Sequence, residues 1–394
     1  MKPARIKILE NQYREALLED VIPFWEMYSI DRENGGYFTC LERDGSVYDT
    51  DKYMWLQGRQ IWTFSMLYNQ CEKIPEWLEI AEIGVNFLKK YGRNADGDWY
   101  FALDKAGKPL VDAYNIFSDC FVAMGFAEYY GATGDETAKK IALDTYWRIQ
   151  QRKNNPKGRF NKIIIQNRQL STMSFPMILL GMTSDIAKWI PQPEFDSVIE
   201  ENLQLVMSKF VDEKLKIVFE TIAPDGSHPD NMLARLLIPG HALEAMWFVL
   251  EIAALRNDLQ LMQKATNAML WTIERGWDEK YGGIFYFMDA KGFSPEPLEW
   301  DMKLWWVHLE ALVAFALAHA LTGKSVFEQW YEKIHDYAWT HFPDPEYGEW
   351  YGYLNRHGEV THTLKGGKWK GCFHVPRALF ICAKLFANMQ AEAA

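Results

Sequence analysis

A short motif that recurs along the chain places the strongest constraint on the fold. It combines glycine with alternating aromatic residues and usually ends in a D-G, K-G or H-G turn, a pattern typical of a β-hairpin. The copies are "NGGYFTCLERDG", "DGDWYFALDKAGK", "PKGRFNKIIIQN", "KIVFETIAPDGS", "YGGIFYFMDAKG" and "YGEWYGYLNRHG". They follow one another at intervals of about 60 residues, which indicates a repeated structural unit.

Two helical segments lie between successive copies of the motif. The first is apolar on nearly all sides, as in "NIFSDCFVAMGFAEYYGATGD", and the second is amphipathic, as in "DETAKKIALDTYWRIQQRK". A helix that is apolar all round is expected to be buried, whereas an amphipathic helix is half exposed. Six such pairs predict an all-α fold, an (α/α)6 barrel of twelve helices in two concentric layers, with short β-hairpins at one end.

The competing architecture is an open helical solenoid. The near-even spacing of the six copies favours a closed ring, in which every repeat buries its apolar face against a neighbour. We expect residues 1–394 to form one (α/α)6-barrel catalytic domain.

Composition excludes several classes of partner. The net charge is −11 and no Lys/Arg cluster is interleaved with aromatic residues, so neither nucleic acid nor an anionic membrane is an expected partner. The most apolar stretch, residues 304–321, contains His308, Glu310 and His319, and we expect a buried helix there rather than a membrane span.

Cysteine usage and the N-terminus both indicate a cytoplasmic protein. The five cysteines are scattered and never in C-x-x-C spacing, which is typical of reduced thiols and argues against a zinc site or a disulfide framework. The N-terminal segment has no uninterrupted apolar run, so no signal peptide is predicted.

In a ring of this kind, polar residues at the starts of the inner helices converge on a central pocket. These positions hold the candidate functional residues. They are Arg59 and Gln60, then Tyr114, Asn115 and Asp119, then Ser174, then His241 and Glu244, then Trp306 and Glu310, and finally His374 and Arg377.

Two of these candidates are histidines that adjoin a proline. His241 follows Pro239 and Gly240, and His374 precedes Val375 and Pro376. Since proline favours the first turn of a helix, both histidines are predicted at helix N-termini. The partial positive charge there favours neutral imidazole, which acts as a base at pH 7.

Spacing relates the carboxylates to these histidines. Glu244 lies three residues after His241 on one helical face, where it is able to orient the imidazole or to bind a sugar hydroxyl. Trp306 and Glu310 also share a face, and an aromatic ring beside a carboxylate is a usual sugar-binding combination. The purely structural alternatives stay open: the histidines as caps, and Arg59 as an ion-pair partner of a carboxylate such as Glu310.

The other histidines are expected to have no catalytic part. His308 lies among apolar residues and is interpreted as structural. Loop or surface positions are expected for His228, His319, His335, His341, His357 and His362.

Several stretches together resemble the N-acylglucosamine 2-epimerase family, whose fold is an (α/α)6 barrel. They are "KYMWLQGRQIWTFS", "LIPGHALEAMW", "LWWVHLEALVAF" and "KGGKWKGCFHVPRAL". The resemblance extends over nearly the whole chain. It implies opening of a pyranose ring, removal of the C2 proton next to the aldehyde, an enediolate-type intermediate and return of a proton on the opposite face.

The resemblance also implies roles for individual residues. His241 and His374 are the expected acid and base, and Arg59 is expected to stabilise the developing oxyanion. The residues expected to bind substrate are Glu244, Glu310, Trp306, Asn115 and Arg377.

On the same basis, the expected reaction interconverts N-acetyl-D-glucosamine and N-acetyl-D-mannosamine, which feeds sialic acid metabolism. No metal or redox cofactor is expected, and ATP is expected as an activator that is not consumed. The chain lacks a G-x-x-x-x-G-K-[ST] loop, so the basic stretch "QRKNNPKGRF" is the candidate for phosphate binding, against the alternative of a solvated loop. The resemblance further suggests a homodimer.

Four alternatives remain. Cellobiose 2-epimerases carry another histidine in the third inner helix, where this chain has "TMSFPMILL", and Gln-Ala-Glu after the tryptophan pair, where it has "WWVHLEAL". Aldose–ketose isomerases of this fold share the two histidines and the arginine. A glycoside hydrolase would use Glu244 and Glu310 as its carboxylates. A non-catalytic interaction protein is disfavoured by the intact His241, His374 and Arg59.

Overall fold

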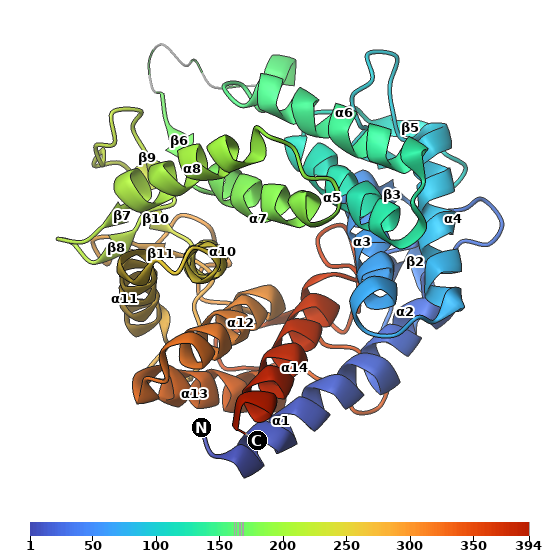
Figure 1. Ribbon diagram of the computed structural model, residues 1–394. Coiled ribbons are helices and arrows are strands. Elements are labelled where there is room, and N and C mark those ends of the chain that lie inside the picture. The colour runs from blue at the N-terminus through green and yellow to red at the C-terminus, as the bar shows by residue number, and fades with distance from the viewer. Residues whose placement is uncertain (161, 163, 165–166, 168, 394) are drawn as a thin grey trace.

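The computed structural model describes residues 1–160, 162, 164, 167 and 169–393. The chain forms two concentric rings of helices (Figure 1). The inner ring contains α3 (Met54–Gln70), α5 (Ile116–Thr133), α7 (Ser174–Trp189), α10 (Pro239–Leu255), α12 (Trp305–Thr322) and α14 (His374–Ala393). The outer ring contains α1 (Pro3–Glu15), α4 (Pro75–Tyr91), α6 (Glu136–Arg152), α8 (Phe195–Leu205), α11 (Leu259–Gly276) and α13 (Ser325–His341). The predicted (α/α)6 barrel is confirmed.

Shorter helical segments complete the rings. Helix α1 continues through a π-helical stretch, Ala16–Val21, into α2 (Ile22–Tyr28), and α8 ends in a second one, Val206–Phe210. The others are a 3-10 turn, Gly158–Phe160, and the four-residue helix α9 (Met232–Arg235).

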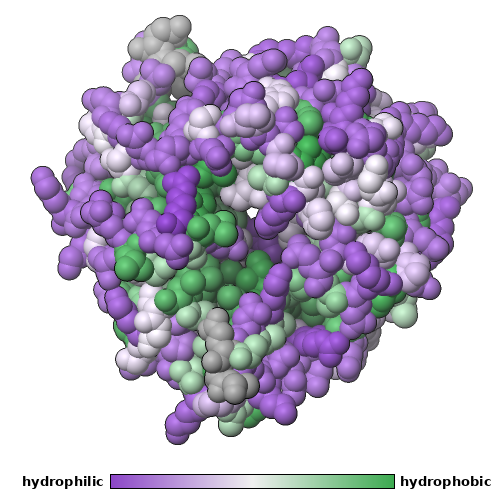
Figure 2. All heavy atoms as spheres, in the orientation of Figure 1, coloured by the Kyte–Doolittle hydropathy of each residue, from purple (hydrophilic) through white to green (hydrophobic). Residues whose placement is uncertain are grey.

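Burial follows the predicted division between the layers. Along α12, the side chains from Trp305 to His319 are buried except that of Trp306, which is half-buried. This helix has the length and apolarity of a membrane span, but 78% of it is buried inside the protein, as expected for an inner helix of the barrel. The face shown in Figure 2 is largely hydrophilic, and a hollow with hydrophobic residues on its wall lies at the centre of this face.

The ring closes where the two ends of the chain meet. Helix α1 packs against α14, and both termini lie at this junction (Figure 1). Next to it, the Thr63 hydroxyl on α3 donates a hydrogen bond to the carbonyl of Cys372 at 2.7 Å, and the rings of Trp62 and Phe373 lie 5.2 Å apart. The open-solenoid alternative is therefore wrong.

Short antiparallel strands gather at the end of the barrel where the inner helices begin. They are β1 (Cys40–Leu41), β2 (Val47–Asp49), β3 (Lys52–Tyr53), β4 (Ala102–Leu103), β5 (Pro109–Val111), β6 (Ser171–Thr172), β7 (Val211–Asp212), β8 (Ile217–Val218), β9 (Thr221–Ile222), β10 (Leu236–Leu237), β11 (Met288–Asp289), β12 (Lys303–Leu304) and β13 (Tyr353–Leu354).

The first and second motif copies form the predicted hairpins, β1–β2 and β4–β5. In the fourth copy, β8 pairs with β7, which precedes the copy, and β9 pairs with β6. In the fifth and sixth copies, β11 and β13 pair instead with β10 and β12, the strands directly before α10 and α12. These pairings connect the start of an inner helix to the next repeat. The hairpin expected in the third copy falls partly outside the described residues.

Buried ion pairs fix the strands that precede the inner helices. In each pair, an aspartate accepts backbone N–H groups of its own turn and binds a lysine that is fully buried. The pairs are Lys52–Asp31 (2.7 Å), Lys303–Asp278 (3.2 Å) and Lys365–Asp344 (2.8 Å). Because Lys52 and Lys303 lie in β3 and β12, these contacts set where α3 and α12 begin.

Two histidines expected at the surface are buried instead. His319 and His335 are only 5% and 4% exposed. The His335 ring lies on the inward face of α13, with Nδ1 at 3.1 Å from the Tyr13 hydroxyl. Tyr13 is on α1, so the contact is between segments far apart in sequence and leaves no local signal.

Candidate active site

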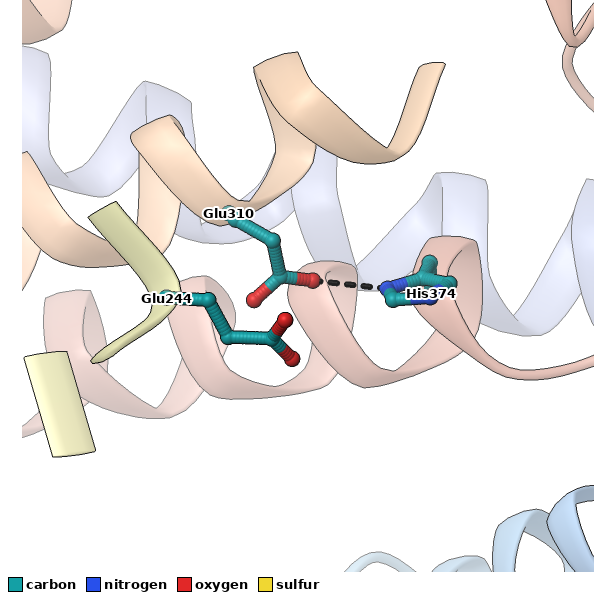
Figure 3. Close-up of side chains that lie close together, drawn as sticks. All are labelled: Glu244, Glu310 and His374. Carbon is teal, nitrogen blue, oxygen red and sulfur yellow. Dashed lines mark hydrogen bonds and ion pairs between the residues drawn. The ribbon is translucent and has the colours of Figure 1, made fainter. Parts of the chain in front are cut away.

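Side chains from α10, α12 and α14 meet at the starts of these helices. Glu244, Glu310 and His374 point toward one another (Figure 3). The Arg377 guanidinium donates through Nη2 to Glu244 Oε1 at 2.7 Å and to Glu310 Oε1 at 2.6 Å. All four residues are less than one-tenth exposed, so this network of charges is held away from bulk water.

The environment of His374 favours neutral imidazole. Its Nδ1 lies 2.7 Å from Glu310 Oε1, so Nδ1 carries the proton and Nε2 has a free lone pair. Burial, followed by the positive charges of Arg59 and Arg377, lowers the pKa of His374 well below its usual value. The prediction of a neutral imidazole at the start of α14 agrees with this shift.

Glu310 has a second contact that fixes its position. Its Oε2 accepts a hydrogen bond from the Trp247 indole at 2.9 Å. Its Oε1 accepts hydrogen bonds from His374 and Arg377. Both carboxylate oxygens are therefore bound to protein donors, and Glu310 orients His374.

His241 differs from the prediction. Burial lowers its pKa, but the charge of Glu220 and the hydrogen bond to it, together with the charges of Glu244 and Glu310, raise the pKa above the ordinary value. The contact joins His241 Nδ1 to Glu220 Oε2 at 3.0 Å. The predicted direction of the pKa shift at this helix start is therefore wrong, because a buried carboxylate outweighs both burial and the partial charge of the helix end.

Glu220 is the site residue that the sequence did not reveal. It lies directly before β9, 21 residues before His241 and in a different segment, and it is 6% exposed. Glu244, which the spacing proposed as the residue that orients His241, binds Arg377 instead. No helical periodicity relates Glu220 to His241, so the contact depends on the tertiary fold.

Trp306 lies between the two histidines. Its ring centroid is 5.3 Å from that of His241 and 6.0 Å from that of His374. Trp306 is half-buried, and the His241 side chain is 25% exposed. One indole therefore adjoins both imidazoles on the accessible side of the buried network.

Arg59 is a buried cation without a counterion among the described residues. Its guanidinium makes no hydrogen bond or ion pair with the described residues, and its Nε is an unsatisfied buried donor. The guanidinium carbon lies 3.9–4.6 Å from the ring centroids of Trp55, Phe121 and Phe373. Burial and the charge of Arg377 lower its pKa to about 9, so it remains charged at pH 7. The alternative that Arg59 pairs with a carboxylate is wrong.

The other candidates lie outside this cluster or have local structural partners. Asn115 caps α5, where its side chain accepts the Phe117 N–H at 3.0 Å. Three further polar residues have partners of their own: Gln60 with Ser29 (2.7 Å), Asp119 with Arg152 (3.1 Å) and Ser174 with Thr172 (3.3 Å). Substrate binding by Asn115 stays a prediction.

His308 has the structural surroundings that the sequence analysis expected. Its Nε2 accepts the backbone N–H of Ile284 at 2.9 Å, and its Nδ1 donates to the carbonyl of Leu304 at 2.8 Å. Burial lowers its pKa to about 3. Both ring nitrogens are occupied, so His308 is unable to exchange a proton with a ligand.

Glu244, Glu310 and His374 are also residue types that bind metals, and their donor atoms lie within 4.8 Å of one another. Arg377 already contributes the positive charge in this cluster. Its Nη2 bonds to both carboxylates and lies 3.4 Å from His374 Nδ1. The donors therefore fit a guanidinium, and a metal ion would have to displace it.

The candidate phosphate-binding stretch has its cations largely paired. Three of its basic residues form ion pairs with acidic groups: Arg152 with Asp119, Lys153 with Glu201 and Arg159 with Asp112. ATP binding there would require these pairs to open, and ATP activation stays a prediction.

An (α/α)6 barrel with two imidazoles at the starts of its inner helices, each bonded to a buried glutamate, has the arrangement of an acid–base enzyme. A family model described as N-acylglucosamine 2-epimerase (GlcNAc 2-epimerase) matches residues 36–378. The chain therefore belongs to the N-acylglucosamine 2-epimerase family, and it is an isomerase.

Individual relatives agree with this assignment. The chain is 38% identical to the N-acylglucosamine 2-epimerase of Bos taurus over 381 residues, which cover 94% of this chain and 90% of the relative. It is 25% identical to the cellobiose 2-epimerase of Dictyoglomus turgidum, and the match covers 94% of this chain and 96% of the relative. The structure of the cellobiose 2-epimerase from Bacillus thermoamylovorans B4167 superposes with a TM-score of 0.83 at 24% identity. The superposition covers 97% of this chain and 100% of the other, so the two share a fold.

Proposed function

We propose that this protein interconverts N-acetyl-D-glucosamine and N-acetyl-D-mannosamine by inverting the configuration at C2. The higher identity to an N-acylglucosamine 2-epimerase than to a cellobiose 2-epimerase supports this substrate class. The start of α7, with Ser174, Phe175 and Pro176, also lacks the histidine that the cellobiose enzymes carry in their third inner helix.

In the proposed reaction the sugar ring opens, and the aldehyde at C1 acidifies the hydrogen on C2. Neutral His374, with Nε2 free, removes this proton from one face, while His241 donates a proton to the other face. The negative charge that develops on O1 is stabilised by Arg59, a cation with no other counterion in the described chain. In the reverse direction the two imidazoles exchange roles. The carbonyl supplies the acidity, so the proposed step requires neither a metal nor a redox cofactor.

The observation that carries this proposal is that the surroundings of the two histidines shift their pKa values in opposite directions. The pKa of His374 is lowered and that of His241 is raised, and the cause in each case is a named set of charged neighbours. Paired groups whose surroundings separate their pKa values are typical of an acid and a base acting together. Both rings also adjoin Trp306, whose indole provides a flat surface for the C–H groups of a sugar.

Glycoside hydrolysis fits the carboxylates less well. A hydrolase needs two carboxyl groups that face each other across the scissile bond. Glu244 and Glu310 instead bind the same Nη2 of Arg377. Both negative charges are therefore paired with one guanidinium inside the protein.

Proton NMR in heavy water tests the proposal. N-acetyl-D-mannosamine, cellobiose and D-mannose are incubated separately, with and without ATP. We expect N-acetyl-D-glucosamine to form with deuterium at C2, and the ATP samples report on activation. Conversion of cellobiose or mannose in place of the N-acetyl sugar would contradict the proposed substrate, and release of a monosaccharide from cellobiose would indicate a hydrolase.

A further inference from the structure

Arg59 is an almost fully buried guanidinium whose donors are not used by the described residues. The residue is 8% exposed, and its side chain donates no hydrogen bond to them. Of its three nitrogens, only Nε is both closed off from solvent and without a partner, so Nη1 and Nη2 are reached by water. A buried polar group without a partner requires an explanation in a folded protein. Two neighbouring N–H donors of a guanidinium match the two oxygens of a carboxylate.

Three aromatic rings hold this charge in place without neutralising it. The guanidinium carbon of Arg59 lies 4.4 Å from the ring centroid of Trp55, 3.9 Å from that of Phe121 and 4.6 Å from that of Phe373. The attraction between a cation and an aromatic face offsets part of the cost of burying the charge. An aromatic ring does not occupy the N–H donors as a carboxylate would, so they remain available to an anion.

The carboxylates whose charges act on Arg59 are bound to another cation. They are Glu244 and Glu310, and each donates one oxygen, Oε1, to the contact with Nη2 of Arg377. The second oxygen of Glu310 accepts the Trp247 indole. Neither carboxylate forms an ion pair with Arg59 within the described part of the chain, so a ligand anion is the partner that this guanidinium lacks.

Phe373 connects Arg59 to the candidate active site. The guanidinium carbon of Arg377 lies 4.6 Å from the centroid of this ring, the same distance as that of Arg59. The centroid of the His374 ring lies 5.3 Å from it, and the charge of Arg59 contributes to the lowered pKa of His374. One aromatic ring therefore adjoins both the free cation and the imidazole that is proposed to act at C2, so a group bound to Arg59 belongs next to C2, at C1.

An aldonate has the features at C1 that this arrangement fits. It is the open-chain sugar in which C1 is a carboxylate, so C1 is planar and carries a negative charge. The enediolate of the proposed reaction also has a planar C1 and a negative charge on O1. Ligands that share the charge and shape of a high-energy intermediate bind more tightly than the substrate does.

We propose that aldonates of N-acylhexosamines bind in the candidate active site, with the C1 carboxylate on Nη1 and Nη2 of Arg59, and inhibit the enzyme reversibly. This inference rests on the proposed function, which places C1 of such a sugar beside the two histidines. It adds a class of ligand, the sugar acids, to the neutral sugars of that function.

Calorimetric titration of the full-length protein with N-acetyl-D-glucosaminate and with the neutral N-acetyl-D-glucosaminitol tests this inference. At about pH 7.5 we expect the aldonate to bind at least about tenfold more tightly than the alditol, which corresponds to ~1.4 kcal/mol. The preference should disappear in Arg59→Met, with binding of the alditol retained as evidence of a folded site. It should remain in the control variant Arg256→Met, which alters a partly exposed arginine at the end of α10.

Equal affinity of the wild-type protein for the two ligands, or a preference for the aldonate that persists in Arg59→Met, would overturn the inference. Absence of aldonate binding to the wild-type protein would overturn it as well. Epimerisation of N-acetyl-D-mannosamine, measured on the same preparation, shows whether the proposed function fails with it or stands alone.

Discussion

At the scale of single residues, the two candidate catalytic histidines owe their different character to different glutamates. Glu310 holds His374 in a network that also contains Arg377, and the nearby cations favour the neutral ring. Glu220 holds His241, and its negative charge raises the pKa of that ring. The opposite pKa shifts of the two imidazoles therefore follow from the buried charges around each ring.

Replacement of Glu220 by glutamine should change the pH profile more than it changes substrate binding. Without the carboxylate the pKa of His241 falls, so the protonated form is lost at lower pH and the alkaline limb of kcat/KM moves to lower pH. We expect kcat to fall by about 10–100-fold with little change in KM, as measured by initial rates across pH. Glu213→Gln, at an exposed position in the preceding turn, is the control. An unshifted profile would show that Glu220 has no influence on the titration of His241.

Replacement of Arg59 by methionine should separate activity from stability. Loss of the cation proposed to stabilise the developing oxyanion is expected to reduce kcat by about 10²–10³-fold. Because Arg59 is a buried charge without a counterion, an apolar side chain of similar length should leave the thermal unfolding midpoint unchanged or higher. Parallel loss of activity and stability would indicate a structural role instead.

At the scale of elements, the helix starts and the layer order were predictable, whereas contacts between segments were not. Apolar periodicity and proline placement correctly gave the buried inner helices and the beginnings of α10 and α14. The partner of His241 and the burial of His335 depend on residues brought together only by the fold. The β11 and β13 pairings likewise join separate repeats, and a local hairpin pattern does not contain that information.

The contact between α3 and α5 gives a prediction at this scale. A Cβ on Gly58 would lie 2.5 Å from the carbonyl oxygen of Phe121, and a Cβ on Gly125 would lie 2.5 Å from the carbonyl oxygen of Gly58. Gly58→Ala should therefore force the two backbones apart and lower the free energy of unfolding by about 1–3 kcal/mol, as measured by urea denaturation. Ser65→Ala, at a buried position on the same helix, should have a much smaller effect. Equal stability of the two variants would contradict the close packing.

At the scale of the whole molecule, closure of the ring brings the active groups together. His241 and His374 are far apart in sequence, on α10 and α14, and α12 between them contributes both Trp306 and Glu310. The repeat count predicted this closure, and with it the convergence of polar residues at one end of the inner helices. The opposite end has a cavity of its own, whose lining mixes ordinary core residues with a few charges that no motif singled out.

The central claim is that His241 and His374 exchange protons with opposite faces of one carbon atom. The most direct test is NMR detection of deuterium at C2 in heavy water, with His241→Asn and His374→Asn each given N-acetyl-D-glucosamine and N-acetyl-D-mannosamine separately. Each variant should lose epimerisation yet still introduce deuterium into one of the two sugars, and the labelled sugar should differ between the variants. Continued epimerisation by either variant, or labelling of the same sugar by both, would contradict the account.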